Sequence, residues 1–274
     1  MKSPAPSLRS SEMAFSLRAG PAGLAATVLL TLSVPVQAFD YKGHALVCAL
    51  AYDALTETTR QAVDQLSARS GLGKPFPQLC SWADDIRSEE RWKYTGPWHY
   101  VNVARNDTDI TPQHCPDQGC VLSAISEMEA RLRKAPQTDW QALLFLGHFV
   151  ADVHQPLHVS YGDDRGGNTF RVSWKGEPTN LHAVWDSRVP GLDADPERNR
   201  SRFQSRMTGF HAHADAGLPL VWAQESLDRT RLVYRTYEPG ENLDDSRVSE
   251  DRVWLQGHMV QAAQRLADLL EDVF

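Results

Sequence analysis

The chain has 274 residues, of which 42% are hydrophobic, so it is long enough for one large domain or two small ones with a sizeable core. Its formal net charge at pH 7 is −7, from 28 basic and 35 acidic residues. This acidic balance argues against broad electrostatic binding of duplex nucleic acid or of anionic membranes. An anionic substrate would need local positive charge, which bound metal ions could supply.

The first 38 residues have the pattern of a secretory signal peptide. Three basic residues precede an apolar run, Gly23–Val34, that is too short to span a membrane, and small side chains stand before a cleavage point after Ala38. An amphipathic or membrane-anchoring helix is the alternative. We expect residues 1–38 to be removed and residues 39–274 to form one secreted or periplasmic domain. Because the leader holds three basic residues and one acidic residue, that domain would carry a net charge of −9.

Apolar residues spaced three and four apart predict helices along most of the mature chain. The predicted helices span 43–56, 57–69, 119–134, 138–154, 181–190, 214–236 and 247–272. The segment 138–154 is apolar nearly all round and offers Thr138 or Asp139 as its N-cap, which is typical of a helix in the middle of a bundle. Only 98–103 and 168–174 alternate like strands, and RGGN at 165–168 indicates a tight turn. The sequence therefore predicts one all-α domain with at most a small β-hairpin.

The mature part contains all four cysteines, an even number that favours disulfides in a secreted chain. Cys115 and Cys120 bracket the turn sequence PDQG, so a short-loop bridge is expected between them, which leaves Cys48 with Cys80. A zinc site is the alternative, although no C-x-x-C spacing is present.

Two histidine–aspartate pairs stand on predicted helices. His148 and Asp152 are four residues apart and so share one helix face, and His182 and Asp186 repeat this spacing. His158 follows the first pair closely, beyond a proline that ends the helix. A single pair is more often a core histidine with a hydrogen-bond partner. Two pairs in a secreted chain favour a metal site, and imidazole with carboxylate suits zinc.

Further candidates lie upstream. His44 stands at the start of the first predicted helix, Asp84 and Asp85 lie in CSWADDIR, and His99 lies in GPWHYVN. Each would be ordinary alone, as a helix-start histidine, an N-cap aspartate or a strand histidine packed under a tryptophan. Together with the two pairs they form an ordered series.

That series resembles the zinc-dependent single-strand-specific nucleases of fungi and plants, the S1/P1 nucleases, and the chain is similar to a bacterial-type member. The resemblance covers essentially the whole mature chain and is carried by GHALV, SWADDIR, WHYVN, HFVADVHQPLHV, RGGN, NLHAVWD and VWAQES. It implies an all-helical fold with three zinc ions in a cleft. The implied enzyme is a phosphodiesterase that hydrolyses RNA and single-stranded DNA to 5′-mononucleotides, with 3′-nucleotidase activity and a metal-bridging hydroxide as nucleophile.

The resemblance also assigns nine residues to the three zinc ions. The three sets are Asp84, His99, His148 and one oxygen of Asp152; His158, His182 and Asp186; and the other oxygen of Asp152, His44, and the α-amine and carbonyl oxygen of Phe39. Five histidines remain and are expected to be surface or packing residues: His114, His154, His211, His213 and His258.

Other residues match substrate-contacting positions of the family. Besides the ligands Asp84 and Asp152, catalysis would involve Arg87, which would steady the extra charge on the phosphorus; a surface ion pair is the alternative. Tyr100 would stack on a base, with a core tyrosine as the alternative. Asn102, which replaces the aspartate of the best-known fungal form, and Asn168 would line the base pocket. The family usually begins its mature chain with tryptophan rather than phenylalanine.

Two other functions fit parts of the pattern. Zinc phospholipase C enzymes share the implied fold and the H-x-x-x-D spacing, but typically have glutamate in the last ligand pair. A secreted zinc-binding protein without catalysis would usually saturate its ions with side chains. We expect a monomer that acts on single-stranded nucleic acid and nucleotides and does not bind membranes.

Overall fold

The structure, a computed structural model, describes residue 1, residues 39–207 and residues 219–274. The predicted signal peptide, the first five residues of the predicted helix 214–236, and His211 and His213 lie outside this part. The described residues from Phe39 onwards belong to one compact unit.

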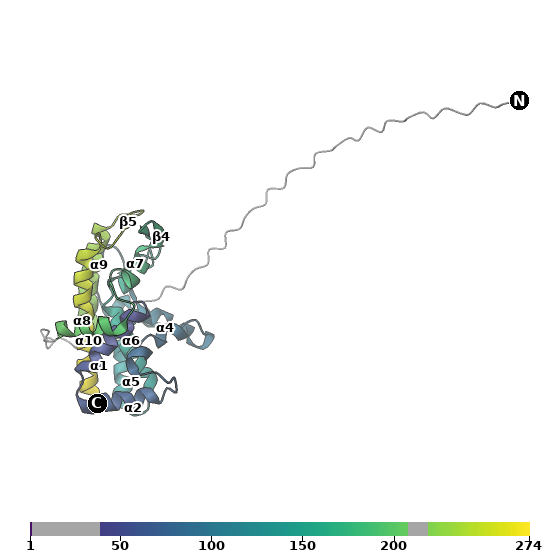
Figure 1. Cartoon of the computed structure of the whole chain (residues 1–274). Coiled ribbons are helices and arrows are strands. Elements are labelled where there is room, and N and C mark those ends of the chain that lie inside the picture. The colour runs from purple at the N-terminus through teal and green to yellow at the C-terminus, as the bar shows by residue number, and fades with distance from the viewer. Residues whose placement is uncertain (2–38, 208–218) are drawn as a thin grey trace. The chain divides into compact units, whose positions relative to one another are not determined.

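The described part of the chain is mainly helical (Figure 1). Its α-helices are α1 (Tyr41–Ala54), α2 (Glu57–Ala68), α3 (Phe76–Leu79), α4 (Trp82–Ile86), α5 (Val121–Lys134), α6 (Trp140–Val153), α7 (Leu181–Ser187), α8 (Pro196–Met207), α9 (Pro219–Thr236) and α10 (Ser249–Val273). Its 3-10 helices are η1 (Glu90–His99), η2 (Pro112–His114) and η3 (Pro156–His158). The expected all-α fold class is confirmed.

Two small sheets accompany the helices. The strands are β1 (Val101–Val103), β2 (Val159–Tyr161), β3 (Arg171–Trp174), β4 (Glu177–Asn180) and β5 (Asn242–Leu243). β1 and β2 pair in parallel, β3 and β4 form the antiparallel hairpin, and β5 adds to β3 in parallel. The sequence prediction of at most one hairpin missed β2, β4 and β5, because β2 and β5 have only three and two residues and β4 (EPTN) has no apolar alternation.

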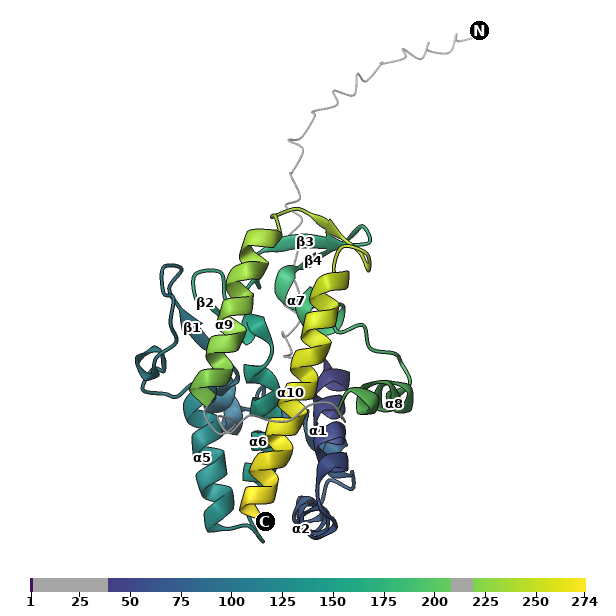
Figure 2. The ribbon, with the colours of Figure 1, turned by 90° about the vertical axis from the view of Figure 1, so that its left-hand side faces the viewer.

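α6 is the central helix. It packs against α1, α2, α4, α5, α9 and α10, and Figure 2 shows it behind α10, between α5 and α1. All its residues from Ala142 to Val153 are buried, as the all-round apolar sequence predicts. Asp139 caps it by accepting a hydrogen bond from the backbone N–H of Ala142 at 3.0 Å. α6 therefore brings its two ionisable residues, His148 and Asp152, into the interior.

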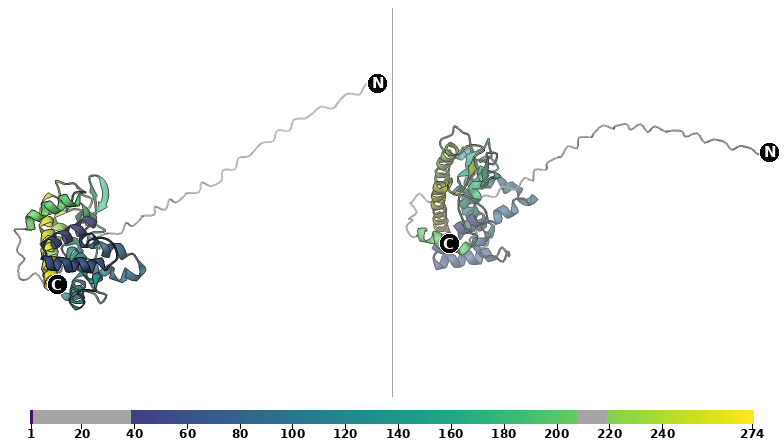
Figure 3. Two further views of the ribbon diagram at one scale, coloured as in Figure 1. Left: turned by 60° about the horizontal axis from the view of Figure 1, so that its bottom comes forward. Right: turned by 45° about the horizontal axis from the view of Figure 1, so that its top comes forward.

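The long C-terminal helices cover α6. α10 packs against α1, α6 and α8, and α9 packs against η3, β2, α5 and α6. The further views in Figure 3 show the yellow C-terminal helix running along one side of the helical body. No helix of the described residues is long and apolar enough to cross a membrane.

Most predicted helices agree with the structure to within a few residues, but α3, α4 and α8 were missed. α3 and α4 have four and five residues, which is too short for a periodic pattern. α8 is strongly polar and buries only Asn199 and Phe203, so it has no apolar stripe to detect.

Candidate metal centre and active site

Eight candidate ligands meet in the interior of the fold, although they come from six elements. α1 supplies His44, α4 supplies Asp84, and η1 and η3 end on His99 and His158. The two i,i+4 pairs come from α6 and α7. All eight residues are between 0 and 8% exposed: His44, Asp84, His99, His148, Asp152, His158, His182 and Asp186. In three groups of these residues, one ligand atom from each lies within 4.8 Å of the others: His44, Asp84 and His148; His99, His148 and Asp152; and His158, His182 and Asp186.

Asp152 belongs to the second group and also contacts His44 of the first. Its Oδ1 lies 3.1 Å from His44 Nε2. Its Oδ2 lies 3.0 Å from His99 Nδ1 and 3.1 Å from His148 Nε2. The two carboxylate oxygens therefore face different histidines, which is the arrangement that a carboxylate shared between two ions requires.

Backbone carbonyls orient three of the histidines. The Nδ1–H of His148 donates to Cys80 O at 2.7 Å, that of His158 to His99 O at 2.6 Å, and that of His182 to Gly166 O at 2.6 Å. Each bond fixes the orientation of the ring and leaves its Nε2 atom available to bind a metal ion in the cluster. This use of the second ring nitrogen is typical of metal-binding histidines.

The turn that orients His182 requires glycine. Gly166 has a φ of +65°, and a Cβ on it would lie 2.5 Å from Leu157 O. The sequence indicated a turn at RGGN but gave no sign of this role. A second residue that the prediction missed is Gln155, which is fully buried and donates through Nε2 to Asp186 Oδ1. The Oε1 atom of Gln155 accepts from Leu157 N, so the amide is held at both ends.

The residues fit a set of cations, because several of their buried polar atoms have no hydrogen-bond partner in the described part of the chain, and one of these, Asp84 Oδ1, has an ion pair with Arg87. Among the described residues, five such atoms belong to the cluster: His44 Nδ1, Asp84 Oδ1, His99 Nε2, His158 Nε2 and Asp186 Oδ2. A buried polar atom without a hydrogen bond costs about 1–3 kcal/mol, so five at one place need an explanation. Nitrogen and carboxylate oxygen donors in this mixture suit zinc.

Opposite charges and burial compete in the pKa values of the first two groups. Burial raises the pKa of Asp152, but the charges of His148 and His158 hold it well below its usual value. Burial lowers the pKa of His148, but the Asp152 and Asp84 carboxylates raise it to about 9. Without metal, His148 would thus be protonated at neutral pH, and a bound cation would displace that proton.

The third group has the opposite balance. Burial, with the charge of His158, lowers the pKa of His182 to about 3, and burial also lowers the pKa of His158. Burial raises the pKa of Asp186 well above its usual value. These shifts keep both imidazoles neutral, so their ring nitrogens can bind a metal ion. Among the described residues, no cationic side chain lies beside the Asp186 carboxyl, and a bound cation would stabilise its ionised form.

Phe39, which the resemblance assigns to a zinc ion, lies next to the cluster. Its side chain is fully buried and its ring centroid is 6.1 Å from that of His44. The following residue, Asp40, caps α1 through its side chain, and its backbone N–H donates to Asp186 O at 3.3 Å. The start of the predicted mature chain is therefore held between α1 and α7.

Asp84 and Asp85 differ although they are neighbours. Asp84 is buried in the cluster, whereas Asp85 is exposed and takes no part in it. The Arg87 guanidinium lies 3.2 Å from Asp84 Oδ1, and its side chain is 20% exposed. Arg87 is thus placed at the edge of the cluster, between buried carboxylate and solvent.

The candidate base-contacting residues are Tyr100, which directly precedes β1, Asn102 on β1, and Asn168 in the turn after β2. Tyr100 is 41% exposed, so it is not a core tyrosine. Asn102 is exposed and lies against Gly162, where a Cβ would be 3.4 Å from Asn102 Cβ. In the turn that follows, Asn168 donates from Nδ2 to Arg165 O, while its Oδ1 is buried without a partner among the described residues.

Both expected disulfides are present, Cys48–Cys80 and Cys115–Cys120. The first lies directly behind the cluster, since a Cβ on Gly147 would be 3.0 Å from the sulfur atoms of Cys48 and Cys80. It joins α1 to the residue whose carbonyl orients His148. The alternative of a cysteine zinc site is therefore wrong.

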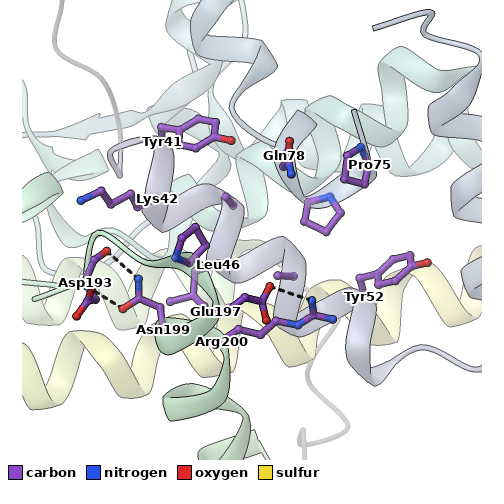
Figure 4. A pocket seen from close by; sticks show the side chains of 14 residues that line it. Tyr41, Lys42, Leu46, Tyr52, Pro75, Gln78, Asp193, Glu197, Asn199 and Arg200 are labelled. Atoms are coloured by element: carbon purple, nitrogen blue, oxygen red, sulfur yellow. Dashed lines mark hydrogen bonds and ion pairs between the residues drawn. The ribbon is translucent and has the colours of Figure 1, made fainter. Parts of the chain in front are cut away.

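The described histidines outside the three sets are packing or surface residues, as expected. His154 and His258 are buried behind α6, and His114 is half-buried and caps η2. A cavity of about 260 Å³ borders another face of α1, where Figure 4 shows Tyr41, Lys42 and Tyr52 opposite Arg200. None of the eight candidate ligands lines that cavity, so it is separate from the metal centre.

The chain is similar to known nucleases over most of its described length. The sequence model described as S1/P1 Nuclease matches residues 39–274. Endonuclease 4 of Arabidopsis thaliana is 30% identical over 266 residues, which cover 85% of this chain and 88% of that protein. Endonuclease 2 of the same plant is 35% identical over 60% of each chain. Nuclease P1 of Penicillium citrinum is 29% identical over 182 residues, which cover 64% of this chain and 61% of that nuclease.

Proposed function

The chain belongs to the S1/P1 nuclease family and is therefore a hydrolase of phosphodiester bonds in nucleic acids, and we propose that it is a zinc-dependent endonuclease of single strands. Its substrates would be RNA and single-stranded DNA, cleaved to 5′-mononucleotides, and it would also remove 3′-phosphates from nucleotides. The observation that carries this proposal is the cluster of five polar atoms that have no hydrogen-bond partner among the described residues, within three buried histidine–aspartate groups.

The ligand assignment follows these groups, with one addition. Three zinc ions would be held by Asp84, His99, His148 and Asp152; by His158, His182 and Asp186; and by Asp152, His44 and the backbone of Phe39. The bound ions would supply Lewis acidity and a water molecule that ionises near neutral pH. The three carboxylates carry −3, so three divalent cations would leave a net charge of +3 that attracts a phosphodiester to an acidic protein.

The other side chains would bind and orient the substrate. Arg87 can donate hydrogen bonds to a phosphoryl oxygen while Asp84 holds its guanidinium in place, and so stabilise the additional negative charge of the transition state. Tyr100 offers an exposed ring on which any base can stack. Asn102 can donate and accept hydrogen bonds at base edges, and the Oδ1 of Asn168 can accept one.

We also propose that residues 1–38 are a cleaved signal peptide, and that the enzyme is a secreted or periplasmic monomer. Cleavage before Phe39 would create the free α-amine that the third set of ligands needs. Two disulfides support an oxidising compartment.

Metal analysis and a substrate panel test the proposal. Purified mature protein should contain three zinc ions per chain, and it should hydrolyse single-stranded DNA, RNA and 3′-AMP but not phosphatidylcholine. Chelation should abolish each activity, and added zinc should restore it. A content near one zinc per chain would refute the trinuclear assignment. The proposed activity would be refuted if the protein hydrolysed only phosphatidylcholine. It would also be refuted if the fully zinc-loaded protein hydrolysed none of these substrates.

A further inference from the structure

Helix α9 contributes two buried hydroxyl groups to the core behind the metal centre. Ser226 and Thr230 are four residues apart, share one face of α9 and are both fully buried. Neither belongs to the candidate ligand groups. Apolar side chains are usual at such positions, so the hydroxyls need a reason.

Both hydroxyls donate to backbone carbonyls of the segment that joins α6 to β2. Ser226 Oγ donates to Val153 O at 2.6 Å. Thr230 Oγ1 lies 2.5 Å from Pro156 O and 3.0 Å from Val159 O, so its single proton is shared between them. This segment begins one residue after Asp152 and contains His158.

The carbonyl of Val153 needs a donor from outside α6, because α6 ends in the buried interior of the fold. The last four carbonyls of a helix have no partner inside it, and Pro156 prevents its continuation. At α6 those of Val150, Ala151 and Asp152 are satisfied locally, by His154 Nδ1, His154 N and Gln155 N. Ser226 completes the set from another helix. In the turn that follows, Pro156 O already accepts from the backbone N–H of Val159, and Thr230 gives it a second donor that also reaches Val159 O.

We propose that Ser226 and Thr230 are positioning residues that set the spacing of the zinc ligands Asp152 and His158. This inference rests on the proposed zinc sites. The two hydroxyls fix the path of the backbone between Asp152, the carboxylate shared by two ions, and His158, a ligand of the remaining ion. Thr230 acts on both sides of His158, so it controls the set His158, His182 and Asp186 more directly than Ser226 does.

α10 supports the same segment through His154. Arg265 Nη1 donates to His154 Nε2 at 2.8 Å, so the Nδ1–H of His154 faces Val150 O. Two hydrogen bonds to Glu225, at 2.7 and 2.9 Å, hold the guanidinium of Arg265. The end of α6 is thus held by side chains of α9 and α10, while the metal ligands face the other way.

Thr230→Val tests the proposal, because valine keeps the shape and removes the donor. Stepwise chelator titration of the zinc-loaded protein should show one zinc ion bound about 10–100-fold more weakly, the usual effect of losing a supporting residue. Thr230→Ser, which keeps the hydroxyl, should restore wild-type affinity. Thr236→Val is the matched control, since Thr236 is exposed on the same helix and donates only to Leu232 O within it.

A double-mutant cycle identifies the site affected. In a His182→Ala background, which already lacks a ligand of the ion held with His158 and Asp186, Thr230→Val should weaken zinc binding no further. Ser226→Ala should weaken binding less than Thr230→Val, and it provides the test if Thr230→Val does not fold.

Two results would overturn the proposal. One is unchanged zinc affinity in Thr230→Val, or in Ser226→Ala where Thr230→Val does not fold. The other is equal weakening of all ions in proportion to a lower unfolding temperature of the metal-free protein, which a purely structural role would produce. Failure of the wild-type protein to bind three zinc ions would instead refute the proposed function, so the two failures are distinguishable.

Discussion

Asp84 and Asp85 allow a test of the metal centre with two identical substitutions. Asp84→Asn removes a buried negative charge from the cluster, whereas Asp85→Asn changes an exposed side chain outside the cluster. We expect Asp84→Asn to lose zinc and to lower hydrolysis by at least about 100-fold, because losing a mere supporting residue already costs 10–100-fold. Asp85→Asn should keep its zinc and most of its activity. Metal analysis and the rate on single-stranded DNA measure both, and similar behaviour of the two variants would contradict the ligand assignment.

The absence of a side chain at Gly43 makes room for Phe39. A Cβ at position 43 would lie 2.7 Å from Phe39 Cβ, which cannot move without its backbone. Gly43→Ala should therefore displace Phe39 and lose the ion that its backbone is proposed to hold, while the set of His158, His182 and Asp186 stays loaded. Zinc content of the processed protein measures this.

Gly257→Ala is the control for that substitution. Gly257 is exposed on α10, and apart from the backbone of its own helix no atom lies within 4 Å of the place that a Cβ would take. Alanine should therefore raise the free energy of unfolding by about 0.5–1 kcal/mol and leave the zinc unchanged. Three zinc ions in Gly43→Ala would show that Phe39 does not need this space.

At the scale of the elements, the packing of α10 on α6 and α9 makes stability depend on pH through His258. Burial lowers the pKa of His258 to about 4, whereas an unfolded histidine titrates near 6.5. Between these values only the unfolded state binds the proton, so stability is present above pH 6.5 and is lost as the pH falls toward 4. The full difference is on the order of 3 kcal/mol.

His258→Gln should therefore lose less stability than the wild-type protein between pH 7 and pH 4.5. Denaturant unfolding of both proteins at each pH measures the effect. Protonation of the metal ligands contributes to both proteins alike, so the difference between them isolates His258. Parallel curves would mean that His258 is protonated in the folded state.

How far the sequence predicts an element depends on how much of it is buried. α6 was predicted with its cap and its ligand pair, because an all-round apolar helix leaves a clear pattern. α8 was missed because its contacts are mainly polar. The two histidine–aspartate pairs stood out because these residues are unusual on apolar segments, whereas His44, Asp84 and His99 were named as candidate ligands only from the family resemblance. Gln155, Ser226 and Thr230 could not be named, since nothing local distinguishes a buried hydroxyl or amide from an exposed one.

At the scale of the whole molecule, the centre joins the two ends of the segment from Phe39 to Asp186. The backbone N–H of Asp40 donates to Asp186 O, so the proposed mature terminus lies beside the last ligand. A free α-amine titrates near 7.7–8.0 and must lose its proton to bind zinc. Protein that begins at Phe39 should thus hold three zinc ions.

The same protein with one additional residue before Phe39 should hold two well-bound ions and hydrolyse single-stranded DNA at least about 100-fold more slowly, on the scale of lost zinc ligation. A protease that exposes Phe39 should restore both properties. Zinc content and rate are to be compared in this matched pair. Equal values would remove the terminus from the list of ligands.

The position of the supporting helices also determines when the centre can form during synthesis. All eight side-chain ligands precede Ser226 in the chain, the last of them by about 40 residues. At about 5–20 residues per second, a ribosome needs a few seconds to add that stretch, and longer to reach Arg265. A nascent chain would therefore display every ligand before the backbone that spaces them is held. Under the proposed function, the messenger and ribosomal RNA beside it would be substrates, and this order would keep the proposed centre incomplete for as long as they are closest.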